Sequence, residues 1–315
     1  MLILKRAASA FALMAVLATG AAQSTTPQAI EVAPGAWMVQ GLSALGSSAN
    51  RNFVSNAGFV ATASGVVLID ALGSPELARE LQAEIARKTG RRVTHVIVTH
   101  YHADHIYGLQ VFRDAGATVI AHRDARLYLN SDTAQARLQA SREELFPWID
   151  EHTRLVPADR WIDGPETLEL GGVQFVLKPV GPAHTPEDLI VWVPSLHTIF
   201  AGDLVFRGRV PFVGQADSAR WIHGLDALLS LEAAVVVPGH GPVSQAQHLR
   251  EDLRLTRDYL AYLRETMGEA ARNLEPFEEA YARTDWSRFE KLPLFGVANR
   301  MNAYNTYLLM EGLTR

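Results

Sequence analysis

Three histidines and one aspartate lie within six residues of one another, at His100, His102, Asp104 and His105 in the segment THYHADH. The β-branched run at residues 96–98, just before this segment, is typical of a strand buried on both faces. Residues i and i+2 that leave a strand point the same way, so His100 and His102 can bind one ion. Asp104 and His105, at the turn into the next helix, can face a second ion beside it. The segment therefore predicts a metal site at the end of a buried strand.

The absence of cysteine limits which metal sites and which reactions are possible. The chain has 315 residues and no Cys, which excludes disulfide frameworks, Cys-ligated zinc, iron–sulfur clusters and thiol nucleophiles. Imidazole nitrogen and carboxylate oxygen are ligands that suit zinc. In an alternative interpretation Asp104 is a helix N-cap and the histidines form a surface cluster, but neither role requires three histidines at this spacing.

The first 22 residues have the layout of a secretory signal peptide. Lys5 and Arg6 precede an apolar run at residues 7–20, and small residues up to Ala22 provide a cleavage site. A membrane anchor is the alternative, but this run of 14 residues is shorter than the ~20 that span a bilayer. We expect cleavage near Ala22, a periplasmic or secreted mature protein, and no stable membrane anchor.

Hydrophobic periodicity predicts an α/β body followed by a helical extension. Ser74 is a predicted N-cap for a helix with Pro75 at its first position and Gly90 at its end. Further strands are predicted near residues 35–41, 56–62, 65–72, 118–121, 167–180, 189–193, 198–202 and 234–238. Further helices are predicted near residues 105–115, 123–145 and 218–231, and helical spacing continues from about residue 245 to the C-terminus.

The net charge of −5 bears on the kind of partner. Nucleic-acid affinity rests mainly on Lys and Arg contacts to phosphate, so a net-negative chain argues against a nucleic-acid partner. Hydrophobic residues make up 48% of the chain, which is ample for a globular core. We expect no nucleic-acid partner, and the oligomeric state is left open.

Three later segments complete a resemblance to the metallo-β-lactamase-fold superfamily. His184 lies in GPAHTPEDL, Asp203 in IFAGDLVF and His240 in VVPGHGPV, each after a predicted strand and in the order of that family. The resemblance implies an α/β fold, an αββα sandwich with the metals at one edge of the two sheets. The expected domains are a signal peptide at 1–22, a catalytic domain at 30–245 and a helical C-terminal extension at 246–315.

The resemblance also implies a ligand set for two ions. The two sets of three are His100, His102 and His184 for the first ion, and Asp104, His105 and His240 for the second. Asp203 would bridge the ions, which is similar to the glyoxalase II-like branch, whereas true lactamases usually have Cys or Ser there. The wider pattern most resembles exported hydrolases found beside sulfur-oxidation and quinoprotein systems.

This ligand set implies an exported dinuclear zinc hydrolase with two Zn²⁺ per chain. Two divalent ions lower the pKa of a shared water from 15.7 toward ~7 and so supply a bridging hydroxide, which the catalytic Asp104 would orient. The expected scissile bond is an ester, thioester, lactone or amide, β-lactams included, and the hydrolase interpretation implies a small-molecule substrate. The alternatives are a mononuclear iron oxidoreductase similar to persulfide dioxygenases, and a protein that uses the metals only to hold a ligand.

Three residues are candidates for contact with the substrate. Arg207 and Arg209 follow Asp203, on the loop where related enzymes often place a cation for a substrate carboxylate; two solvated loop arginines are the alternative. The Gly/Ser/Asn-rich stretch at 41–53 is interpreted either as a flap over the site, with Phe53 touching substrate, or as a plain hairpin loop.

Overall fold

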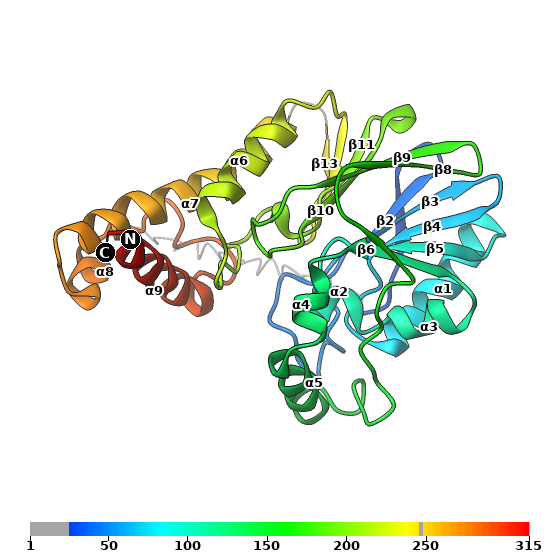
Figure 1. The fold of residues 1–315 in the computed structure, drawn as a ribbon, viewed down its shortest axis with the longest axis horizontal. Coiled ribbons are helices and arrows are strands. Elements are labelled where there is room, and N and C mark those ends of the chain that lie inside the picture. Colours follow the sequence, from blue (N-terminus) through cyan, green and yellow to red (C-terminus); the bar gives the residue numbers. More distant parts are fainter. Residues whose placement is uncertain (1–24, 246–247, 315) are drawn as a thin grey trace, which may run out of the picture.

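Two β-sheets packed face to face form the centre of the structure, a computed structural model that describes residues 25–245 and 248–314 (Figure 1). In order across the first sheet, the strands are β1 (Ala29–Ala33), β2 (Ala36–Val39), β3 (Ala57–Thr62), β4 (Gly65–Ile69), β5 (Val93–Ile97), β6 (Thr118–His122) and β7 (Arg160–Ile162). In order across the second sheet, they are β13 (Ser244–Gln245), β12 (Val235–Val237), β11 (Thr198–Phe200), β10 (Leu189–Val193), β9 (Val173–Pro179) and β8 (Glu166–Leu170).

Helices cover the outer faces of both sheets. Those near the first sheet are α1 (Pro75–Thr89), α2 (Ala103–Ile106), α3 (Leu109–Asp114), α4 (Ala125–Leu129) and α5 (Asp132–Glu144). Those beyond the second sheet are α6 (Ser218–Leu229), α7 (Leu249–Arg272), α8 (Phe277–Arg283) and α9 (Phe295–Thr314). Two short 3₁₀ helices, η1 (Pro194–Leu196) and η2 (Gly202–Leu204), flank β11. The predicted αββα sandwich with a helical C-terminal extension is confirmed.

Three apolar clusters correspond to the three contacts between these four layers. The middle cluster fills the space between the sheets, with Met38 and Ile97 from the first sheet against Phe175 and Phe200 from the second. Burial of such side chains stabilises the fold by roughly 25 cal/mol for each Å² of apolar surface removed from water. The outer clusters hold the helices to the sheets and leave the sheet edges to carry the polar loops.

The helix predicted after Ser74 is confirmed at both ends. The Ser74 side chain accepts a hydrogen bond from the backbone N–H of Leu77, and Pro75 occupies the first turn. Gly90 ends the helix in the left-handed conformation with φ of 66°, which glycine adopts without steric cost. This helix packs on the first sheet and follows β4, whose carboxyl end borders the polar cluster described below.

Three predicted elements are each divided in the structure. The strand predicted at 167–180 is the hairpin β8–β9, because Gly171 and Gly172 both have positive φ and form its two-residue turn. The helix predicted at 123–145 is divided into α4 and α5, where Ser131 caps α5 by accepting from the N–H of Ala134. The helix predicted at 105–115 is divided into α2 and α3.

The C-terminal extension consists of α7, α8 and α9, and α7 and α9 lie side by side (Figure 1). Within the described residues, no helix has the length and apolar character needed to cross a membrane. The predicted signal peptide at 1–22 lies outside the described residues.

Candidate metal centre

The seven predicted ligands come together at one edge of the two sheets. Each leaves the end of a strand or starts the helix after it: β5 and α2 for the THYHADH motif, β9 for His184, η2 for Asp203 and β12 for His240. Their donor atoms form two groups, each within 4.8 Å. The groups are His100, His102, His184 and Asp203, and Asp104, His105 and His240.

The Asp203 carboxylate lies between the two groups. Its Oδ2 is 3.4 Å from Nε2 of His184 and 3.3 Å from Nε2 of His240. Its Oδ1 is 3.2 Å from Nε2 of His105. Asp104 reaches the same space, with Oδ2 at 3.3 Å from Nε2 of His240. One carboxylate therefore faces ligands of both groups, as a bridging ligand must.

The donor atoms of the cluster fit metal ions. Nε2 of His100, Nε2 of His105 and Oδ1 of Asp203 are buried and have no hydrogen-bond partner. Leaving a buried polar atom unpaired costs ~1–3 kcal/mol, so several together at one point indicate a missing partner. Imidazole nitrogens and carboxylate oxygens without sulfur suit zinc and also accept iron.

Hydrogen bonds on the far side of three of the five rings aim their ligand nitrogens inward. Nδ1 of His240 donates to the carbonyl of Val54 at 2.8 Å, and Nδ1 of His100 donates to Oγ1 of Thr99 at 3.0 Å. Nδ1 of His105 donates to Oδ2 of Asp70 at 2.9 Å. Each bond fixes the tautomer that leaves Nε2 free for a metal.

Burial and neighbouring charges set the protonation of the cluster. Burial holds the pKa of His100 well below its usual value and lowers the pKa of His184 to about 3, so both rings are neutral. Burial also lowers the pKa of His105, but the carboxylates of Asp203, Asp104 and Asp70 together raise it well above its usual value. Burial raises the pKa of Asp203, but nearby histidines outweigh burial and hold it well below its usual value. A metal that binds His105 therefore displaces a proton.

Asp70 is a functional residue that the sequence analysis missed. It follows β4 and accepts hydrogen bonds from His105, from the N–H of Thr99 at 2.8 Å and from the Thr99 hydroxyl at 2.8 Å. Its backbone has φ of 61°, a left-handed conformation that Asp and Asn tolerate better than most residues. The available signal was a lone carboxylate at the end of an apolar strand.

We predict that Asp70→Asn lowers metal affinity or kcat/KM by about 10- to 100-fold, the range typical of partners behind a ligating histidine. Asparagine keeps the backbone conformation and the size but removes the negative charge behind His105. Metal titration and steady-state kinetics measure both effects. Asp159→Asn is the matched control, because Asp159 likewise accepts a backbone hydrogen bond, from Val119, but its ion pair is with Arg113 and not with a candidate ligand. Unchanged affinity and activity in Asp70→Asn would contradict a role for Asp70.

The metal cluster opens into a cavity of about 350 Å³, here called the metal pocket. Its described lining includes Asp104, Arg137 of α5 and Arg209. Arg209 is 1% exposed, its guanidinium lies over the rings of Phe206 and Phe212, and Nη2 has no hydrogen-bond partner. Burial lowers the pKa of Arg209, and the carboxylates of Asp203 and Asp104 oppose that effect. Two cations therefore line the pocket.

Of the three candidate substrate contacts, one lines the metal pocket and two lie elsewhere. Arg209 lines the metal pocket, whereas Nε of Arg207 forms an ion pair with Asp252 at 2.8 Å and lines another cavity. Phe53 is 1% exposed and packs in the core of the first sheet. The stretch at 41–53 reaches the metal pocket through other residues, among them Leu45 and Asn52.

A four-layered sandwich with His/Asp ligands at the edge of its sheets defines a class of metal-dependent hydrolases. The family model described as Metallo-beta-lactamase superfamily matches residues 50–240, and the chain belongs to this superfamily. It is similar to a linear primary-alkylsulfatase from Pseudomonas sp., at 25% identity over 63% of this chain and 44% of that protein. It is also similar to a type 2 metallo-beta-lactamase from Bacillus cereus, at 27% identity over 68% of this chain and 77% of that protein.

Solved structures show the same fold. A stereoselective inverting sec-alkylsulfatase from Pseudomonas sp. has a TM-score of 0.74 at 18% identity, covering 90% of this chain and 50% of that chain. A metallo-beta-lactamase from Pontibacter korlensis has a TM-score of 0.57 at 23% identity, covering 75% of this chain and 99% of that chain. The chain thus spans about half the length of the alkylsulfatases it resembles.

Proposed function

We propose that this protein is an exported dinuclear zinc hydrolase that cleaves an ester, thioester, lactone or amide bond in a small anionic substrate. The observation that carries the proposal is the pair of complete ligand groups that meet at Asp203. A mononuclear iron centre would use one such group and would leave the second without a role. Export rests on the leader at residues 1–22, with cleavage near Ala22 and a periplasmic or secreted product.

Each group of residues has a defined task in this mechanism. His100, His102 and His184 would hold one ion, Asp104, His105 and His240 the other, and Asp203 both. The metals would supply a water of lowered pKa and would polarise the scissile bond. The Asp104 side chain is 22% exposed in the pocket, where it would accept a hydrogen bond from the attacking water and orient it.

The unpaired Nη2 of Arg209 supports an anionic substrate. A buried N–H donor of a cation is costly to leave without a partner, and a carboxylate or sulfate group on the substrate would accept from it. Arg137 also lines the pocket, although its Nη1 pairs with Glu144 at 3.2 Å. The names of the relatives suggest alkyl sulfates and β-lactams as the first compounds to test, alongside thioesters and lactones.

We predict that Arg209→Met raises KM for an anionic substrate by about 10- to 100-fold, because a charged hydrogen bond contributes ~1.5–3 kcal/mol. Steady-state kinetics on the first substrate found in such a screen measures the change, and the metal content of the variant is expected to stay unchanged. Arg207→Met is the matched control, since Arg207 lies two residues away and pairs with Asp252. Equal kinetic effects in the two variants would contradict the assignment of Arg209 to the substrate anion.

A further inference from the structure

A second cavity of about 380 Å³, here called the side chamber, adjoins the metal pocket across Phe212. The metal pocket and the side chamber share His102, His184 and Phe212 as walls. The remaining lining of the side chamber is mainly uncharged and includes Tyr128 of α4 and residues 213–215. A substrate held at the metals therefore has a second space beside its reacting group.

The two cavities differ in their charged residues. Arg137 and Arg209 line the metal pocket, and so do Asp104 and Asp203, whose carboxylates would be neutralised by bound metal ions. Among the described residues that line the side chamber, Glu187 is the one carboxylate and none is Lys or Arg. Glu187 is 4% exposed and accepts from the N–H of Tyr101 at 3.1 Å. A negative group on the substrate is thus attracted to the metal pocket and repelled from the side chamber. The uncharged part of the same substrate is left to the aromatic and apolar walls.

The C-terminal extension binds the segment at residues 211–216, here called the wall, which separates the two cavities at Phe212. Asn302 of α9 is 1% exposed, and its Oδ1 accepts from the N–H of Val213 at 2.9 Å while its Nδ2 donates to the carbonyl of Pro211 at 2.7 Å. One amide therefore binds the residues on both sides of Phe212. The N–H of Val210 donates separately to the carbonyl of Pro293 at 3.1 Å, which secures the segment nearer Arg209.

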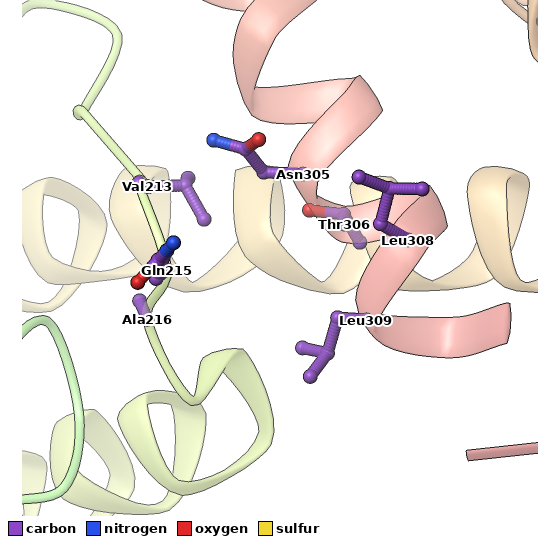
Figure 2. A pocket seen from close by; sticks show the side chains of 8 residues that line it. Val213, Gln215, Ala216, Asn305, Thr306, Leu308 and Leu309 are labelled. Atoms are coloured by element: carbon purple, nitrogen blue, oxygen red, sulfur yellow. The ribbon is translucent and has the colours of Figure 1, made fainter. Parts of the chain in front are cut away.

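Side chains pack against this wall on only part of the side that faces the extension. Val213 and Ala216 belong to the buried cluster that includes Ala298 and Ala303 of α9. A cavity of about 280 Å³ nevertheless lies between the wall and the middle turns of α9, where Asn305 and Leu309 face it (Figure 2). The hydrogen bonds of Asn302 therefore add to this packing in setting the distance of the wall from the extension.

We propose that the side chamber binds the apolar part of the substrate, and that Asn302 is a positioning residue that sets the width of the chamber through Phe212. The inference rests on the proposed function, because it assumes that the substrate anion lies at Arg209. The occupant it names is an alkyl or aryl group attached to the anionic, hydrolysable part of one molecule.

Alkanesulfonates of increasing length test the chamber directly. Their dissociation constants for the zinc-loaded protein are measured by calorimetry with methanesulfonate, butanesulfonate and octanesulfonate, none of which carries an ester bond. Affinity is expected to rise by up to about fourfold per methylene that enters the chamber. Equal affinity for all three would overturn the side chamber alone. Failure of all three to bind would overturn both this inference and the anionic-substrate proposal.

Variants of two asparagines in α9 distinguish a positioning role of Asn302 from a general contribution to stability. Asn302→Leu is expected to reduce the preference for octanesulfonate to within threefold of methanesulfonate, with methanesulfonate affinity unchanged within twofold. Asn302 also donates to the Tyr259 hydroxyl at 3.0 Å. Asn299→Leu is the matched control, since Asn299 is buried one turn away and accepts from the same hydroxyl, but none of its hydrogen bonds in the described structure reaches the wall. Equal length dependence in the two variants would overturn the role of Asn302.

A variant at the exposed face of the wall keeps the test decisive if Asn302→Leu does not fold. Gln215 is exposed and lines the chamber, so Gln215→Trp is expected to fold and to fill the space. Octanesulfonate affinity is expected to fall to that of methanesulfonate, which should bind as in the unmodified protein. Unchanged octanesulfonate affinity would overturn the chamber as its site.

Discussion

Replacing Asp203 with asparagine is expected to lower kcat/KM by at least about a thousandfold and to reduce the metal bound per chain. The substitution preserves size and burial but removes the negative charge that faces His105, His184 and His240. Metal ions contribute several kcal/mol of transition-state stabilisation, and about 4 kcal/mol corresponds to a thousandfold in rate. Steady-state kinetics and elemental analysis of the purified variant measure the two effects together.

The position of Asp203 explains why this loss should exceed that of any other single ligand. Each histidine belongs to one group, whereas the Asp203 carboxylate, a member of the first group, also faces His105 and His240 of the second. Asp163→Asn is the control, because Asp163 is exposed and pairs only with Arg123 in the described structure, so its kinetics should be unchanged. An Asp203→Asn protein with full activity and two bound ions would contradict the bridging assignment.

The ligand motif was predictable because its geometry is local. His100 and His102 leave one buried strand, and Asp104 and His105 begin the next helix, so four ligands depend on a single strand end. The ligands from other strand ends are separated in sequence by up to 140 positions, and they could be assigned only through the family resemblance. The alternation of strands and helices predicted an α/β body, whereas the two-sheet sandwich was predicted through the family resemblance.

The residues that support the ligands were not predictable, because they depend on pairing between distant segments. Asp70 reaches His105 only because β4 and β5 lie parallel in one sheet, with their carboxyl ends side by side. Asn302 reaches Pro211 across 91 positions, through the packing of α9 on the body. Neither residue stands in a motif, and a lone Asp or Asn is common at strand ends and within helices.

The two arginines show the limit of reasoning from spacing. Arg207 and Arg209 are separated by one residue and would point the same way in an extended strand. Gly208 between them has φ of 69°, a left-handed conformation, so the chain turns there. Arg207 consequently pairs with Asp252 and Arg209 enters the metal pocket.

Removing the metal is expected to have the second large effect, on both activity and thermal stability. The mature protein purified without chelators is expected to contain about two zinc ions per chain, and removing them with a chelator should abolish activity and lower Tm by roughly 10 °C. Metal present at about a thousand times its Kd stabilises the folded state by ~4 kcal/mol, and 1 kcal/mol shifts Tm by ~2–4 °C in a chain of 150–250 residues. The metal-free protein must bury the unpaired donor atoms of His100, His105 and Asp203, so the loss has a structural origin. Adding zinc back should restore both quantities.

The metal content of variants that lack one ligand distinguishes two bound ions from one. His240 belongs to the second group alone, so His240→Ala is expected to retain about one ion per chain and to lose most of the activity. His152 lies at the surface with 81% of its side chain exposed, so His152→Ala should retain two ions and full activity. About one iron per chain, unchanged by His240→Ala, would instead support the mononuclear oxidoreductase, because the second group would then hold no metal. Oxygen consumption with persulfide substrates would be the assay that follows from that result.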